Sequence, residues 1–332
     1  MKAELSDHYI HTLPCGMRII CAAGPTEVVY CGLAVDAGTR DELDSESGMA
    51  HFTEHLSFKG TRRRKAWHII NRMESVGGDL NAFTGKEETV YYCTCLKQHL
   101  PRAIDVLADI ALNSTYPQHE MDKEVEVVAS EIESYNDSPG ELIYDEFENN
   151  LYKGHEMGRN ILGTTELVSS YTRNDLCRFL NSNYSTDRMV IATIGDISFE
   201  KFKNKVITYF SDYQSVCTTF HRTRFNLQHT FNIVQERNNH LSHRIIGGLA
   251  NHIDSEKKMQ MVLLNNILGG PGMNSRLNLN IREKYGFAYT IESQYNAYSD
   301  TGNFSIYMGV DPQSLDKAIN LVFKELDKLK DN

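Results

Sequence analysis

The chain has 332 residues, 41% of them hydrophobic, and a formal net charge of −10. This length and composition are enough for two domains, or one large one, with ordinary hydrophobic cores. The acidic balance excludes a general nucleic-acid-binding protein, because a surface that follows phosphates needs a net basic face. The one basic run, at residues 62–65, is expected to form a solvated loop.

Seven cysteines are scattered along the chain without the spacing of a disulfide framework. An odd, irregular set of this kind favours reduced thiols in a cytosol-like compartment. The amino terminus lacks the apolar core of a signal peptide, and no stretch approaches the length of a membrane span. These features predict a cytoplasmic protein that does not enter a membrane.

Apolar periodicity predicts strands and helices in alternation over residues 9–113. The expected strands lie at 18–21, 28–35, 80–84 and 89–96, and the expected helices at 66–76 and 99–113. A further helix is expected around residues 49–58, with Ser45 or Ser47 as its N-terminal cap.

That helix contains the motif His51-x-x-Glu54-His55. Two histidines four residues apart lie on one helical face, one turn from each other, and Glu54 shares that face. Two such imidazoles can both reach one zinc ion, and the carboxylate beside them can take a proton from the zinc-bound water. This residue order is the signature of the inverzincins. The alternative is a surface or core helix that carries two histidines by chance.

A second informative helix is expected at residues 121–132. Glu124 and Glu131 are seven residues apart, which is two helical turns, so their side chains project from one face with Val128 between them. Charges in line with an apolar residue are costly to bury unless they are paired or bind a metal. On spacing alone, an acidic solvent-exposed face is the favoured reading.

From residue 141 the rest of the chain completes the first half, and it starts the same order of elements again beyond a polar stretch without periodicity at 212–223. It is expected to contain helices at 141–182 (with a break near Gly154), 199–210, 255–268, 275–284 and 312–330, and strands at 189–196, 231–234, 244–250, 288–296 and 302–310. We therefore expect an α+β fold of two related halves, each a mixed or antiparallel sheet with helices packed on one face. The expected domains are a zinc-binding domain at 1–215, a linker at 216–225, and a truncated C-terminal domain at 226–332 that lacks the motif.

With these motifs in this order, the chain resembles the pitrilysin/insulinase family of zinc metallopeptidases, in particular its short, mitochondrial-processing-peptidase-like branch. The resemblance is carried by the helix with His51 and His55, by the segments 77–84 and 268–277, by Glu131 standing 76 positions after His55, and by Arg282 and Tyr289. It extends over nearly the whole chain, although members of this branch are normally longer.

The resemblance implies one Zn²⁺ per chain, held by His51, His55 and Glu131. It also implies that Glu54 acts as the general base on the zinc-bound water. Glu124 matches the accessory acid of the family, and we group it with Glu54 in the catalytic set, where it orients a ligand or supports the helix. The alternative for Glu124 is a plain surface acid.

The resemblance further implies that Asn81 and the backbone around Ala82 pair with an extended peptide substrate, and that Arg282 and Tyr289 hydrogen-bond to it. The expected activity is that of a zinc-dependent endopeptidase acting on unfolded peptides or short polypeptides. The expected partner is a second copy, giving a homodimer, or a related subunit, giving a heterodimer. Two alternatives are a non-catalytic homologue that serves as a partner or scaffold subunit, and a binding protein with a structural zinc.

Overall fold

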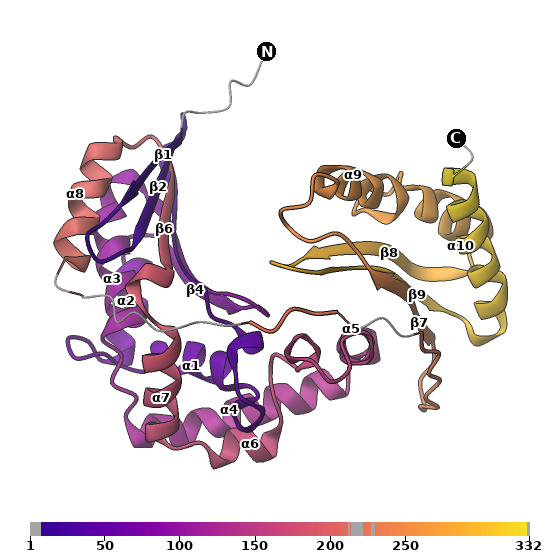
Figure 1. Cartoon of the computed structure of the whole chain (residues 1–332), viewed down its shortest axis with the longest axis horizontal. Helices are drawn as coiled ribbons and strands as arrows, with labels where there is room; N and C mark the ends of the chain where they lie inside the picture. The colour runs from indigo at the N-terminus through magenta and orange to yellow at the C-terminus, as the bar shows by residue number, and fades with distance from the viewer. Residues whose placement is uncertain (1–7, 212, 214–221, 227–229, 331–332) are drawn as a thin grey trace. The chain divides into compact units, whose positions relative to one another are not determined.

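The computed structural model describes residues 8–211, 213, 222–226 and 230–330. The chain divides into two compact units, the first formed by residues 1–132 and 159–222 and the second by residues 133–158 and 223–332 (Figure 1). Residues 133–158 thus group with the second unit, although the sequence assigned them to the first domain. The predicted linker at 216–225 lies largely outside the described residues.

The first unit is built on a sheet of six strands with the order β1-β2-β6-β3-β5-β4. The strands are β1 (His8–Thr12), β2 (Arg18–Ala23), β3 (Val28–Val35), β4 (Asp79–Thr84), β5 (Thr89–Leu96) and β6 (Met189–Gly195). Strands β2 and β6 run parallel, and the other neighbours are antiparallel. The sheet is therefore mixed, as expected.

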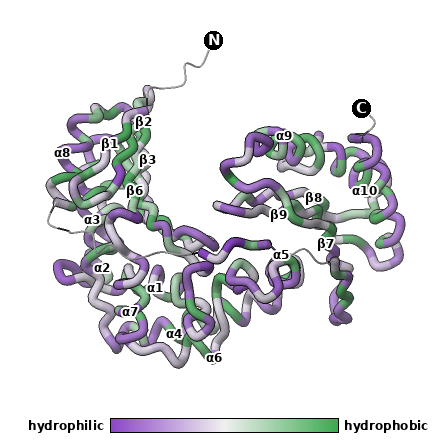
Figure 2. Tube along the Cα trace, in the orientation of Figure 1, coloured by the Kyte–Doolittle hydropathy of each residue, from purple (hydrophilic) through white to green (hydrophobic). Residues whose placement is uncertain are grey.

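One face of this sheet carries the main hydrophobic core. Strand β3 shows the reason, because alternate residues along it are buried, and among them Val29, Leu33 and Val35 are fully buried. Figure 2 shows the hydrophobic residues along β3 and β6. The helices that pack on this core are α2 (Ala66–Glu74), α3 (Leu100–Leu112) and α8 (Phe199–Phe210).

A second core surrounds α1 (Met49–Ser57), the helix that holds the histidine motif. It buries Met49, Phe52 and Leu56 against residues of α4 (Gln118–Asn136), α6 (Thr165–Ser170) and α7 (Arg173–Asn183). All of the α1 residues except His55 are buried. Helix α1 is consequently fixed on several sides, which holds its histidines in one place.

The second unit is built on an antiparallel sheet of three strands, ordered β7-β9-β8. Its strands and helices are α5 (Pro139–Leu151), β7 (Ser242–Leu249), α9 (Lys258–Gly269), a π-helical turn (Asn278–Glu283), β8 (Ala288–Ala297), β9 (Gly302–Val310) and α10 (Leu315–Lys330). Residues of α10 and the π-helical turn pack on the sheet in a core that includes Ile281, Ile306 and Val322. No helix in the described part of the chain is long and apolar enough to cross a membrane.

The α+β architecture is confirmed, and three local predictions are wrong. Residues 231–234 form no strand, because this short apolar run pairs with none of the described strands and leaves Val234 78% exposed. The segment 141–182 is not one broken helix but three separate helices, α5 to α7. The basic run is not wholly solvated, since Arg64 is largely buried and pairs with Asp105 and Asp109 of α3.

Candidate metal centre and active site

The start of α1 is held by a buried glutamate rather than by the predicted serines. Gly48 precedes the helix with a φ of 92°, a conformation that suits glycine. The Glu42 carboxylate accepts hydrogen bonds from the backbone N–H groups of Gly48 (3.1 Å) and Ala50 (2.8 Å). The prediction that Ser45 or Ser47 caps this helix is wrong. A 3-10 turn at Asp44–Glu46 brings the Glu42 carboxylate next to the first backbone N–H groups of the helix.

The structure brings His51, His55 and Glu131 together. The Nε2 atom of His51 lies 3.8 Å from Oε1 of Glu131, and the Nε2 atom of His55 lies 3.5 Å from Oε2 of the same residue. One ligand atom from each residue lies within 4.8 Å of the other two. The His51 side chain is buried and the His55 side chain is partly buried, whereas the Glu131 side chain is 44% exposed, so the group opens to solvent on the side of Glu131.

Glu124 orients the second histidine of this group. Its Oε1 atom lies 2.9 Å from Nδ1 of His55, and its Oε2 atom lies 2.7 Å from Nζ of Lys59. Burial alone would raise the pKa of Glu124, but the hydrogen bonds from His55 and Lys59 outweigh burial and lower this pKa. An ionised Glu124 accepts a hydrogen bond from the Nδ1–H group of His55, and the neutral form of His55 then carries its lone pair on Nε2, the atom that lies 3.5 Å from Glu131.

Burial lowers the pKa of His51 to about 3, and the neighbouring charge of His55 adds to this effect. His51 is therefore neutral at physiological pH and keeps a lone pair for a metal ion. The Nδ1 atom of His51 is buried and has no hydrogen-bond partner among the described residues. For His55, burial would lower the pKa, but the bond to Glu124 and the nearby carboxylates raise it.

The residues present fit a zinc ion. Ligand atoms about 2.1 Å from a tetrahedral zinc lie roughly 3.4 Å from one another, close to the 3.5 and 3.8 Å separations found here. Two imidazoles and one carboxylate are the donors that catalytic zinc sites use, with a fourth position left for water or substrate. The carboxylate–histidine contact of Glu124 with His55 is the usual support of such a ligand.

Glu54 lies on the same helix and is 9% exposed. Its Oε2 atom accepts a hydrogen bond from the hydroxyl of Thr84, at the end of β4, with a distance of 2.7 Å. Burial raises the pKa of Glu54, and the Thr84 bond opposes this shift. A carboxyl group with a raised pKa beside a metal site is suited to accept and release a proton.

Strand β4 is the edge of the six-stranded sheet, and it carries Asn81 and Ala82. Asn81 is exposed, and its Oδ1 atom accepts the backbone N–H of Ala82 at 2.8 Å. The Ala82 N–H is thus held by the preceding side chain at the exposed edge of the sheet.

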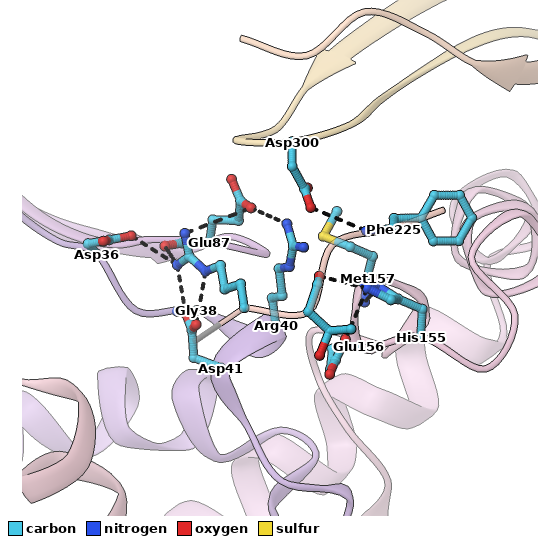
Figure 3. A network of polar contacts seen from close by, with 12 residues as sticks. Asp36, Gly38, Arg40, Asp41, Glu87, His155, Glu156, Met157, Phe225 and Asp300 are labelled. Atoms are coloured by element: carbon cyan, nitrogen blue, oxygen red, sulfur yellow. Dashed lines mark hydrogen bonds and ion pairs between the residues drawn. The ribbon is translucent and has the colours of Figure 1, made fainter. Parts of the chain in front are cut away.

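A set of ion pairs holds the turn after β4 to the segment that leads into α1. Arg40 and Glu87 form a buried pair with 2.6 Å between Nη1 and Oε1 (Figure 3). Arg222 donates two hydrogen bonds to Asp41, at 2.9 and 2.8 Å, and one to the carbonyl oxygen of Glu87. These contacts tie residues 40 and 41, which precede α1, to Glu87 in the turn between β4 and β5.

Arg282 and Tyr289 belong to the second unit. Arg282 lies in the π-helical turn, and its side chain is 43% exposed. Tyr289 is the second residue of β8 and is 78% exposed. Both side chains can donate hydrogen bonds to a ligand.

Three residues of the site were missed from the sequence, namely Glu42, Lys59 and Thr84. Thr84 had a usable signal, because it follows Ala82 by two positions and therefore lies on the same face of the strand. Lys59 had no such signal, because its contact is with Glu124 on a helix far along the chain. Glu42 had no comparable signal, since its contact depends on the turn between it and the helix.

The sequence matches two family profiles. Residues 18–165 match "Insulinase (Peptidase family M16)", and residues 170–332 match "Peptidase M16 inactive domain". The uncharacterized zinc protease YmxG of Bacillus subtilis is 34% identical over 323 residues, which cover 96% of this chain and 78% of that protein. The mitochondrial-processing peptidase subunit beta of Pongo abelii is 30% identical over 96% of this chain and 67% of its own length.

Solved structures agree in fold. A protease from Helicobacter pylori superimposes with a TM-score of 0.89 at 22% identity, covering 98% of this chain and 81% of that one. The periplasmic protease PqqL of Escherichia coli gives 0.78 at 20% identity, covering 97% of this chain and 37% of PqqL. With its two profile matches and its relatives named as zinc proteases, the chain belongs to the insulinase family, peptidase family M16.

Proposed function

We propose that the chain is a zinc-dependent endopeptidase that hydrolyses peptide bonds in unfolded peptides or short polypeptides. The observation that carries this proposal is the convergence of His51, His55 and Glu131 within 4.8 Å, with Glu54 on the same helix as the two histidines. A structural zinc site normally has four protein ligands, whereas three ligands leave room for the reaction. Membership of a family of zinc proteases supports the same conclusion.

In this proposal His51, His55 and Glu131 hold the zinc ion. When bound, the ion lowers the pKa of a water molecule and polarises the scissile carbonyl. Glu54 accepts a proton from the attacking water and passes it to the amine of the leaving peptide. Glu124 keeps His55 in the tautomer that presents Nε2.

Substrate binding is proposed for four residues. The open edge of β4 at Asn81 and Ala82 would take the peptide as an added strand, with main-chain hydrogen bonds giving affinity. Arg282 and Tyr289 would donate hydrogen bonds to substrate carbonyls or to the oxyanion that develops during attack. Their exposed side chains support this role.

Two further points stay predictions. The first is assembly into a homodimer or a heterodimer with a related subunit, which light scattering of the purified protein would test. The second is a cytoplasmic location, which cell fractionation would test. One protein of similar structure, PqqL, is described as periplasmic, so this experiment has two well-defined outcomes.

The proposed function is tested by zinc content and by cleavage of a library of short unstructured peptides. The wild type is compared with Glu54→Gln, and Glu126→Gln on the exposed face of α4 serves as the matched control. We expect zinc in all three proteins, with cleavage at least about a hundredfold slower in Glu54→Gln alone. Zinc without cleavage in the wild type would instead identify a non-catalytic homologue.

A further inference from the structure

The hydrogen bond between Thr84 and Glu54 joins a rigid donor to a flexible acceptor. The Thr84 hydroxyl lies 2.7 Å from Oε2 of Glu54. A threonine side chain is restricted at its single χ1 angle, whereas a glutamate has three rotatable bonds and several low-energy rotamers. The bond therefore selects one position of the Glu54 carboxylate and occupies one of its two oxygens.

The direction of the Thr84 side chain is set by the strand. Thr84 is the last residue of β4 and pairs with Thr89 of β5. Residues 80, 82 and 84 are half-buried, while 79, 81 and 83 are exposed, so Thr84 lies on the inner face. Helix α1 packs against this strand. Thr84 thus reaches Glu54 from the strand that would pair with the substrate.

The turn after β4 is held to the segment before α1. The N–H of Thr39 donates to the carbonyl of Gly85 (3.2 Å), and the N–H of Arg40 donates to the carbonyl of Lys86 (2.8 Å). A side chain at position 38 has no room, because a Cβ there would lie 2.5 Å from both of these carbonyl oxygens. The turn that follows Thr84 is therefore packed closely against residues 38–40, which precede the helix of Glu54.

We propose that Thr84 is a positioning residue for the general base, and that its hydroxyl holds the Glu54 carboxylate so that Oε1 receives the proton. During attack the water O–H bond breaks, the proton moves to Oε1, and the water oxygen bonds to the carbonyl carbon of the peptide. The peptide carbon–nitrogen bond then breaks, its electron pair goes to the nitrogen, and the proton moves from Oε1 to that nitrogen, which releases the free amine of the departing segment. This inference rests on the proposed function, because it requires Glu54 to be the base.

A residue that only positions the base affects turnover and leaves binding unchanged. For Thr84→Val, which removes the hydroxyl and keeps the side-chain volume, we expect kcat to fall about ten- to a hundredfold. KM for the peptide and the zinc affinity, measured by competition with a chelator, should stay within about twofold of the wild type. Thr84→Ser restores the hydroxyl and should recover most of kcat. Thr94→Val, in the neighbouring strand β5 and also half-buried, is the matched control.

The decisive arm repeats Thr84→Val in the Glu54→Gln background. Because Thr84 acts through Glu54, the residual rate should not fall further there. A full additional loss, a serine variant as slow as the valine variant, or weakened zinc binding would show a merely structural role and overturn the inference.

The two proposals fail in different ways. Loss of cleavage in Glu54→Gln combined with full activity in Thr84→Val overturns the role of Thr84 and leaves the peptidase function standing. Wild-type cleavage by Glu54→Gln, or no cleavage by any protein including the wild type, overturns the proposed function and this inference with it.

Discussion

The Nδ1 atom of His55 lies 2.9 Å from Oε1 of Glu124, so a carboxylate of α4 holds an imidazole of α1. The same helix supplies Glu131 two turns later, and Glu131 faces both histidines. Helix α4 therefore contributes one candidate ligand directly and orients a second. The position of α4 against α1 decides whether the metal centre exists.

Removing the Glu124 carboxylate is expected to weaken zinc binding. In Glu124→Gln the charge that keeps the Nδ1 proton on His55 is lost, so we expect a zinc affinity about 10- to 100-fold lower. The measurement is zinc binding in competition with a chelating dye. Glu126→Gln is the control, because it makes the same change on the exposed side of this helix. If both variants bind zinc with the same affinity, Glu124 does not support the zinc ligand His55.

Zinc is expected to stabilise the folded protein, since a ligand that binds only the native state raises the free energy of unfolding. Chelation of the wild type should therefore lower the Tm, and added zinc should restore it. A variant with His51→Ala and His55→Ala should have a Tm that neither treatment changes. A chelator effect of the same size in that variant would place the stabilising metal elsewhere.

Glu42→Ala is expected to destabilise the fold by about 2 to 4 kcal/mol, because it leaves two buried backbone N–H groups, those of Gly48 and Ala50, without an acceptor. Glu42→Gln keeps one acceptor oxygen and should cost less. Urea denaturation measures both values. Ser45→Ala, at the exposed one of the two serines expected to cap the helix, should leave the stability unchanged.

Glu42 also predicts a pH dependence. Burial raises its pKa well above the usual value of 4.5, although the N–H groups of Ala50 and Gly48 and the charge of Arg159 oppose the shift. Since the folded pKa exceeds the unfolded one, the contribution of Glu42 to stability is complete below about pH 4.5 and is lost as the pH rises through the folded pKa.

Glutamine does not ionise, so the Glu42→Gln variant lacks this contribution. The free energy of unfolding of the wild type, taken relative to Glu42→Gln, should therefore fall as the pH rises from the usual glutamate pKa through the raised pKa of Glu42 in the folded protein. A difference that stays constant or grows with pH would show that Glu42 is readily ionised in the folded protein.

The exposed apolar face of helix α9 leads us to expect that the protein associates with itself. Met259, Leu263 and Ile267 lie one turn apart on this helix and are 70%, 61% and 46% exposed. Apolar surface gathered on one helical face favours binding to a second hydrophobic surface. We expect light scattering to show mass increasing with concentration, and Leu263→Lys to reduce this increase. Ile10→Lys, at an exposed apolar residue of β1, is the control. A mass equal to that of one chain at every concentration would contradict the expectation.

The ligand positions could be predicted because they depend on spacing within helices. His51 and His55 share a face since four residues make about one turn, and Glu124 and Glu131 share a face since seven make about two. Spacing alone left Glu131 on an acidic solvent-exposed face, and the family resemblance identified it as a ligand. The structure brings the three residues together, and their binding of zinc stays a prediction.

Other features could not be predicted, because periodicity does not reveal which distant group a side chain will meet. Arg64 reads as part of a solvated basic run, yet it is paired with Asp105 and Asp109, more than 40 positions away. The run at 231–234 has the composition of a strand, but a strand also needs a partner with free backbone groups, and it pairs with none of the described strands.

The candidate ligands lie on two helices that are far apart in the chain, His55 on α1 and Glu131 on α4, 76 positions later. An ion held by both would tie these positions together much as a disulfide does, closing a loop of that length. The stabilisation would act on α1 and α4, because no candidate ligand lies on a strand of the sheet. Loss of the ion should therefore speed amide hydrogen exchange in these two helices before it affects β3 or β5.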